Sequence, residues 1–62
     1  MKRRDLVKHL NNEGCLLKRE GGSHSVFINT INKKISAIPR HNEINDFLIK
    51  KICKDLDVKS PN

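Results

Sequence analysis

The chain has 62 residues, with 13 Lys and Arg against 7 Asp and Glu, and carries a formal net charge of +6. This length predicts one domain over residues 1–62 with a small core, which excludes a large cofactor site or a deep cleft. The charge favours phosphate-rich or acidic partners, and a nucleic acid, an anionic membrane surface and an acidic protein all fit it. No apolar run approaches the roughly 20 residues that span a bilayer, so we expect no membrane partner.

The first predicted element is a short amphipathic helix over about residues 3–13. Its apolar residues recur at helical spacing, with charged or amide residues between them, and Gly14 follows as a left-handed cap. The periodic residues are Leu6, Val7 and Leu10.

Three short β-prone runs follow, over residues 15–19, 25–29 and 34–38. Gly21-Gly22 breaks the chain between the first two runs. Residues 30–33 predict a hairpin turn between the second and third, with Asn32 as the residue suited to a positive φ. The three runs therefore predict an antiparallel meander.

A second amphipathic helix is predicted over about residues 45–56, with Asn45 as its cap and Asp46 complementing its dipole. Its expected buried side chains are Phe47, Leu48, Ile52, Cys53 and Leu56. The tail over residues 57–62 has little to bury and is expected to fray. The fold class is α+β, in the order α-β-β-β-α, with both helices on one face of a three-stranded antiparallel sheet.

The cysteines and histidines predict no metal or cofactor site. Cys15 and Cys53 lie in apolar segments and indicate small buried thiols. No export signal follows Met1, so we expect the cytoplasm and no disulfide. The candidate ligands are scattered, without the close pairs that preorganise a tetrahedral metal site. They are His9, Cys15, His24, His41 and Cys53.

The tripeptide Gly22-Ser23-His24 is the feature most suggestive of chemistry. It lies between the basic pair Lys18-Arg19 and the apolar run 26–28. An imidazole titrates near neutrality, so it can take a proton from a ribose hydroxyl and return one to a leaving oxygen, while the cations hold a phosphate. A polar His at a sheet edge, and a solvated basic strand, fit the same residues. Alternation along the strand leaves open which face His24 occupies.

The order of elements resembles the double-stranded-RNA-binding fold, and the motifs resemble a HicA-type toxin, a small bacterial mRNA interferase paired with a HicB-type antitoxin. The resemblance covers about residues 2–58. Two positions depart from the pattern: Cys15 replaces a common aromatic residue, and Ser25 replaces a second His found directly after the first in many relatives. The matching residues are Leu6, Leu10, Gly14, Lys18-Arg19, Gly22-Ser23-His24, Phe27, Ile38-Pro39-Arg40-His41, Leu48 and Ile52.

The resemblance implies the toxin of a type II toxin–antitoxin system, a metal-independent endoribonuclease that cleaves mRNA and arrests translation and growth. His24 would be its catalytic residue, and the implied partners are a HicB-type antitoxin and mRNA. The residues expected to bind RNA are Lys18, Arg19, Gly22 and Ser23. Two alternatives stay open from the residues alone: a non-catalytic module that grips duplex RNA, and a basic domain that docks an acidic protein.

Three further residues have more than one reasonable role. Lys33 and Lys34 lie on a predicted turn, where charge also serves solubility. His41 follows Pro39-Arg40, where a local hydrogen bond or a cap is as reasonable as a part in catalysis.

Neither aromatic residue is expected to be accessible for base stacking, because Phe27 and Phe47 are both expected to lie in the core.

Overall fold

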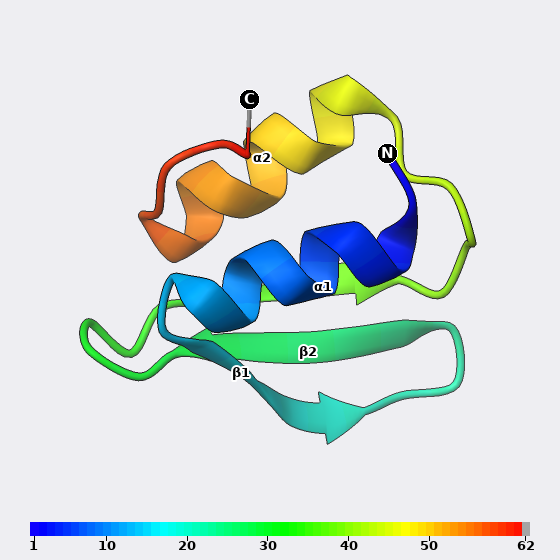
Figure 1. Cartoon of the computed structure of the whole chain (residues 1–62). Coiled ribbons are helices and arrows are strands. Elements are labelled where there is room, and N and C mark those ends of the chain that lie inside the picture. Colours follow the sequence, from blue (N-terminus) through cyan, green and yellow to red (C-terminus); the bar gives the residue numbers. More distant parts are fainter. Residues whose placement is uncertain (62) are drawn as a thin grey trace.

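The structure is a computed structural model that describes residues 1–61. The chain folds in the order α-β-β-β-α, as predicted (Figure 1). The elements are α1 (Arg3–Asn12), β1 (Cys15–Glu20), β2 (His24–Asn29), β3 (Ile35–Pro39) and α2 (Asp46–Leu56).

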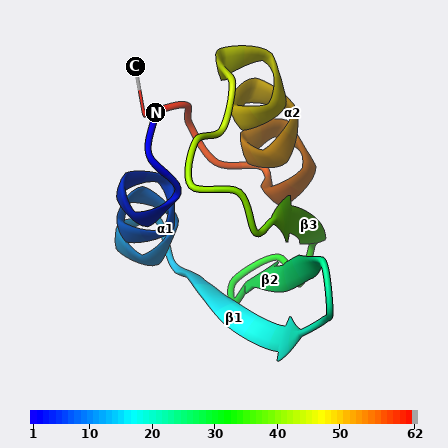
Figure 2. The ribbon, with the colours of Figure 1, turned by 90° about the vertical axis from the view of Figure 1, so that its right-hand side faces the viewer.

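The three strands form one antiparallel sheet in the order β1-β2-β3. Both helices lie on the same side of this sheet, with α1 over β1 and β2 and α2 near β3, so the predicted layer arrangement is confirmed (Figures 1 and 2). The other face of the sheet has no helix over it. This open face of the sheet is central to the site described below.

The core lies between the helices and the covered face of the sheet. Its apolar members are each at most 3% exposed, and Val7, Leu48 and Val58 pack partly buried against them. Burial of these side chains is the main apolar driving force that holds α1 and α2 on the sheet. The core residues are Leu6, Leu10, Cys15, Phe27, Ile38, Ile44, Ile49, Ile52, Cys53 and Leu56.

The predicted helix signals act as expected. Asn45 caps α2, its side-chain oxygen accepting a hydrogen bond from the backbone N–H of Leu48 at 2.8 Å. Asp46 lies in the first turn, where a carboxylate complements the helix dipole. Gly14, which follows the C-cap residue Glu13 of α1, has a φ of 87°, a conformation that favours glycine.

Two expectations about individual residues are wrong. The residue with a positive φ in the turn between β2 and β3 is Lys33, at 68°, and not Asn32. Asn32 instead uses its side chain, which accepts a hydrogen bond from the N–H of Lys34 and donates one to the carbonyl of Leu56. Phe47 is not in the core but 82% exposed, because it shares the solvent-facing stripe of α2 with Lys50, Lys51 and Lys54.

The tail beyond α2 contacts the rest of the fold. Asp57 adopts a left-handed conformation and ends the helix, and the N–H of Val58 donates to the carbonyl of Cys53. The ring Nε2 of His9 lies 2.8 Å from the carbonyl oxygen of Lys59. Asn62, the last residue of the predicted fraying tail, lies outside the described residues.

Neither α1 nor α2 has the length and apolar character that a membrane-spanning helix needs, and residues 1–61 contain no other helix that does.

Candidate functional site

Strand register assigns His24 to the open face of the sheet. In β2, Ser25, Phe27 and Asn29 are buried beneath the helices, and strand alternation turns the intervening residues the other way. His24 therefore shares the open face with Val26 and Ile28, and it is exposed. This settles the question that alternation in the sequence left open.

A β-bulge interrupts β1 at its basic pair. Leu17 pairs with Phe27, but the next paired residue is Arg19, opposite Val26, so two residues of β1 face one of β2. Arg19 is thereby brought to the open face, diagonal to His24 across the two strands. Lys18 and Arg19 are both exposed. Without the bulge, strict alternation after Leu17 would have sent Arg19 to the helix side.

Backbone hydrogen bonds hold the peptide of His24 on both sides. The N–H of Gly21 donates to the carbonyl of His24 at 2.7 Å, and the N–H of Arg40 donates to the carbonyl of Ser23 at 3.3 Å. His24 also pairs with Pro39 in the β2–β3 ladder. Among the described residues the imidazole has one side-chain hydrogen-bond partner, Ser23, whose Oγ lies 3.1 Å from its Nδ1. The side chain is exposed, and the backbone around it is hydrogen-bonded to neighbouring segments.

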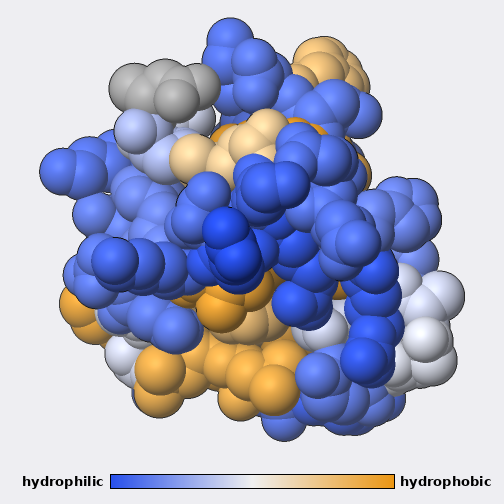
Figure 3. Space-filling model, turned by 45° about the vertical axis from the view of Figure 1, so that its right-hand side comes forward, coloured by the Kyte–Doolittle hydropathy of each residue, from blue (hydrophilic) through white to orange (hydrophobic). Residues whose placement is uncertain are grey.

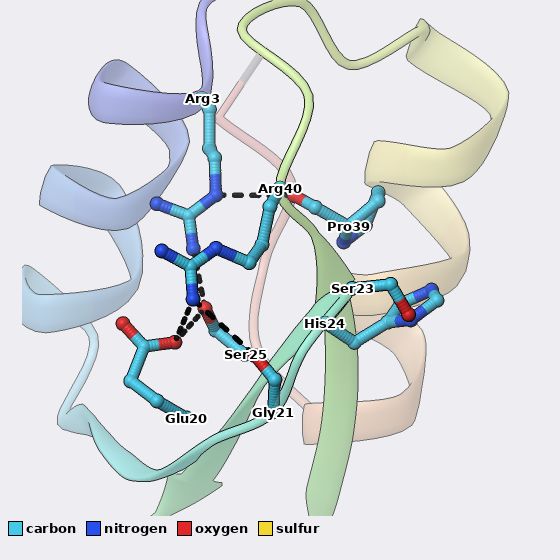
Figure 4. Close-up of polar contacts among 8 residues, drawn as sticks. All are labelled: Arg3, Glu20, Gly21, Ser23, His24, Ser25, Pro39 and Arg40. Atoms are coloured by element: carbon cyan, nitrogen blue, oxygen red, sulfur yellow. Dashed lines mark hydrogen bonds and ion pairs between the residues drawn. The ribbon is translucent and has the colours of Figure 1, made fainter.

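A polar cluster lies directly behind His24, on the helix side of the same sheet end (Figure 4). The hydroxyl of Ser25 is fully buried; it donates to the Glu20 carboxylate at 2.5 Å and accepts from the Arg3 guanidinium at 2.7 Å. Arg3 also donates to the carbonyl of Pro39, and Arg40 pairs with Glu20 at 3.4 Å. The cluster ties α1 to the ends of all three strands.

This cluster explains the departure at Ser25. The Ser25 side chain points away from His24 and is fully engaged with Arg3 and Glu20. Figure 4 shows Ser23 and His24 directed away from that cluster. Ser25 therefore contributes no second proton-transfer group beside His24, and its role is to hold the hairpin end against α1.

Some of the other candidate residues lie next to His24, and others lie far from it. Gly22 and Ser23 are exposed in the turn that precedes His24. Lys33 and Lys34 lie at the opposite end of the sheet, about 17 Å away along β2, so they do not join the His24 site. His41 is exposed in the loop after β3, and its ring makes no hydrogen bond to another residue among those described.

Neither metal nor thiol chemistry is suggested by the described residues. Across residues 1–61, no three His, Cys, Asp or Glu side chains gather as a metal site. Cys15 and Cys53 are buried and unpaired, as the sequence predicts. Burial raises the pKa of both thiols, and the negative charge of Glu13 raises it further, so both stay protonated at neutral pH.

Sequence reasoning missed the residues that hold the strand ends around His24 in place. Arg3, Glu20 and Arg40 had no role assigned to them, and the sequence indicates Gly21 only as a strand breaker. A side chain at Gly21 would place its Cβ 2.8 Å from the carbonyl oxygen of His24, closer than real Cβ atoms approach. The Gly21-Gly22 pair was the available signal for this close approach.

One of three comparisons with known proteins gives a match. The comparisons with curated proteins and with solved structures give no match. A family model described as the HicA toxin of bacterial toxin–antitoxin systems matches residues 3–58. That range contains both helices, all three strands and His24 with its supporting cluster. The chain therefore belongs to the HicA toxin family.

Proposed function

We propose that this toxin is a metal-independent endoribonuclease that cleaves mRNA, with His24 as its catalytic residue. The observation that carries the proposal is an exposed His24 at a hydrogen-bonded strand end, diagonal to Arg19 on the open face. Family membership supports a toxic activity, and the net charge of +6 favours a polyanionic substrate.

The proposed reaction needs no group beyond those of the chain and the RNA. His24 removes the proton of a ribose 2′-hydroxyl, whose oxygen forms a bond to the adjacent phosphorus. The bond from phosphorus to the 5′-oxygen breaks, and that oxygen takes a proton from the imidazolium. Arg19 and Lys18 offset the charge that develops on the phosphate, Arg19 through a bidentate fork.

Ser23 and Gly22 have supporting roles in this proposal. A hydrogen bond between Ser23 Oγ and His24 Nδ1 orients the ring and leaves Nε2 directed at the substrate. A Cβ added at Gly22 would have no heavy atom within 4 Å, and Gly22 has no positive φ, so the fold itself does not require glycine there. A close approach of the RNA backbone would require it.

The chemistry of the products tests this mechanism. Purified toxin in EDTA should cleave RNA and leave 2′,3′-cyclic phosphate and 5′-hydroxyl ends, because the 2′-oxygen is the nucleophile. A substrate with one 2′-deoxy nucleotide at the cleaved position should stay intact at that bond. Strict dependence on added Mg²⁺, or cleavage of the deoxy-substituted bond, would show that the mechanism is different.

Salt dependence tests the RNA path across Lys18 and Arg19. In the cleavage-deficient His24→Ala background, Lys18→Gln with Arg19→Gln should weaken RNA binding and reduce the slope of log K against log salt. The expected reduction is roughly 0.7 for each RNA phosphate that the variant toxin no longer neutralises.

The matched control removes the same charge from the far end of the sheet. Lys33→Gln with Lys34→Gln lowers the net charge by the same two units, so long-range attraction changes equally in both proteins. We expect its salt slope to stay close to that of the parent. Equal slopes for the two double variants would mean that the RNA path does not follow the basic pair on β1.

A further inference from the structure

The solvent-facing side of α2 carries an exposed aromatic ring among lysines. The side chains follow the i, i+3, i+4, i+7 spacing of one helical face and line a surface hollow of about 300 Å³. The phenyl ring is 82% exposed, and all the lysines are exposed. Figure 3 shows an apolar group among hydrophilic side chains at the top of the molecule, on the side of α2. The four residues, here called the Phe47 platform, are Phe47, Lys50, Lys51 and Lys54.

The fold does not account for an aromatic ring at this position. The core side of α2 is supplied by other residues, including Ile49, Ile52 and Leu56, each at most 1% exposed. The exposure of Phe47 also reverses the expectation that no aromatic ring is accessible for base stacking. An exposed ring that packs on nothing in the core is available to a partner.

Two of the three lysines are free to bind an anion. Lys51 donates to the Asp55 carboxylate at 3.0 Å, one turn further along α2. Lys50 and Lys54 form no ion pair or side-chain hydrogen bond with any other residue of the described range 1–61. They lie one helical turn apart, about 6 Å along the axis, so their charges act on the same stretch of a bound polymer.

Contacts with β3 place the platform near the end of the sheet that carries His24. The hydroxyl of Ser36 in β3 donates to Asp55 at 3.3 Å. From this contact β3 continues three residues, about 10 Å, to Pro39, and α2 extends back eight residues, about 12 Å, to Phe47. The two elements run in opposite directions, so both steps lead to the same end of the molecule (Figures 1 and 2). Pro39 is the partner of His24 in the sheet.

The chemistry of the platform is that of a single-strand binder. Proteins that bind unpaired RNA combine cations for the phosphates with aromatic rings on which bases stack. Such a ring accepts any base, because every base has a π-face. The net charge of +6 attracts the same polymer from a distance.

Three other occupants fit the platform poorly. A membrane-surface helix inserts a continuous apolar face, but that face of α2 is buried in the core, which leaves Phe47 alone. A second copy of the chain would set lysine against lysine. Lysine is depleted from protein interfaces, whereas three lysines surround this ring.

We propose that the Phe47 platform is a second RNA site, which stacks one unpaired base on the Phe47 ring and holds adjacent phosphates with Lys50 and Lys54. A strand bound there crosses the edge strand β3 to reach His24. Duplex RNA cannot use the ring in this way, because its bases are already paired and stacked. Continuation of the strand into the His24 site rests on the proposed function, whereas binding at the platform does not.

Phe47→Leu tests stacking, because it keeps an apolar side chain and removes the aromatic face. In the His24→Ala background it should raise the Kd for an unstructured RNA of about 12 nucleotides roughly fivefold or more, as the loss of one stacked base predicts. Phe47→Tyr keeps the ring and should bind this RNA like the parent. The same RNA annealed to its complement should bind both variants equally well. In the active toxin, Phe47→Leu should raise the RNA concentration that gives half-maximal cleavage by a similar factor.

Fluorescence locates the stacked base. The chain contains no Trp or Tyr, so Phe47→Trp introduces a single indole. Its emission should be quenched when the single-stranded RNA binds, because a base then lies on the indole. The matched control is Ile31→Trp, at a position 83% exposed beside Lys33 and Lys34 in the turn at the other end of the sheet. The emission of the control should change little at the same RNA concentration.

The part of the lysines is measured by salt dependence. Lys50→Gln with Lys54→Gln should reduce the slope of log K against log salt by roughly 0.7 for each phosphate that is no longer neutralised. Lys33→Gln with Lys34→Gln removes the same charge and serves again as the control. Equal slopes in the two double variants would show that these lysines do not hold the RNA.

Three results would overturn the proposal. The first is parental affinity of Phe47→Leu for the single-stranded RNA. The second is an equal loss of affinity for the single strand and for the duplex, which would exclude stacking of an unpaired base. The third is a Phe47→Trp emission that responds to phosphatidylglycerol vesicles or to the purified antitoxin but not to RNA, which would assign the platform to another partner. Full cleavage by His24→Ala would reject the proposed reaction and leave these binding results in force.

Discussion

His24→Ala should lower the rate of RNA cleavage by a factor of about 10² to 10⁴ and abolish growth arrest, the range expected when one general acid–base group is removed. The fold should survive, because the side chain is exposed and its one side-chain hydrogen-bond partner among the described residues is Ser23. RNA binding should also survive, since Lys18 and Arg19 remain. The measurements are single-turnover cleavage, circular dichroism and RNA titration.

Two controls separate a chemical role from a structural one. His9→Ala removes the same side chain from the end of α1, where the ring contacts the carbonyl of Lys59, and should leave cleavage unchanged. Imidazole added to the His24→Ala protein should restore part of the activity, because a small base can enter the vacated position. Full activity in a folded His24→Ala protein would end the proposal for His24.

The secondary structure could be predicted from the sequence because its signals are local. Helical spacing, the Asn45 cap and the β-prone runs each depend on residues within a few positions, and all five elements are present in the predicted order. Binary patterning misplaced Phe47, since it was grouped with Leu48 and Ile52. Helical spacing also groups Phe47 with Lys50, Lys51 and Lys54, and the structure follows that second pattern.

The geometry of the candidate site depends on contacts that are distant in the sequence. The bulge at Lys18 is a property of strand pairing, and the bond from Arg3 to Ser25 joins residues 22 positions apart. Neither leaves a local pattern. Sequence reasoning could therefore name His24, Lys18 and Arg19, but it could not say that β1 must bulge for Arg19 to reach the face of His24.

Gly21→Ala should reduce RNA cleavage about 100-fold although the residue is expected to contact no substrate. The added Cβ would lie 2.8 Å from the carbonyl oxygen of His24, and this neighbour is backbone, so relief requires movement of the His24 peptide itself. The same movement weakens the bond from the Gly21 N–H to that carbonyl. A displacement of about 1 Å at a reacting group can cost a factor of about 10² in rate.

Gly22→Ala provides the comparison that identifies the cause. Its added Cβ meets no heavy atom within 4 Å, so its thermal stability should match that of the parent, whereas Gly21→Ala should unfold at a lower temperature. The backbone amide NMR signals of Ser23 and His24 should shift in Gly21→Ala and stay in place in Gly22→Ala. If cleavage falls in Gly22→Ala with these signals unmoved, the reduced rate reports the approach of RNA to Gly22. Parental activity in Gly21→Ala would instead show that the exact position of the His24 peptide does not limit the reaction.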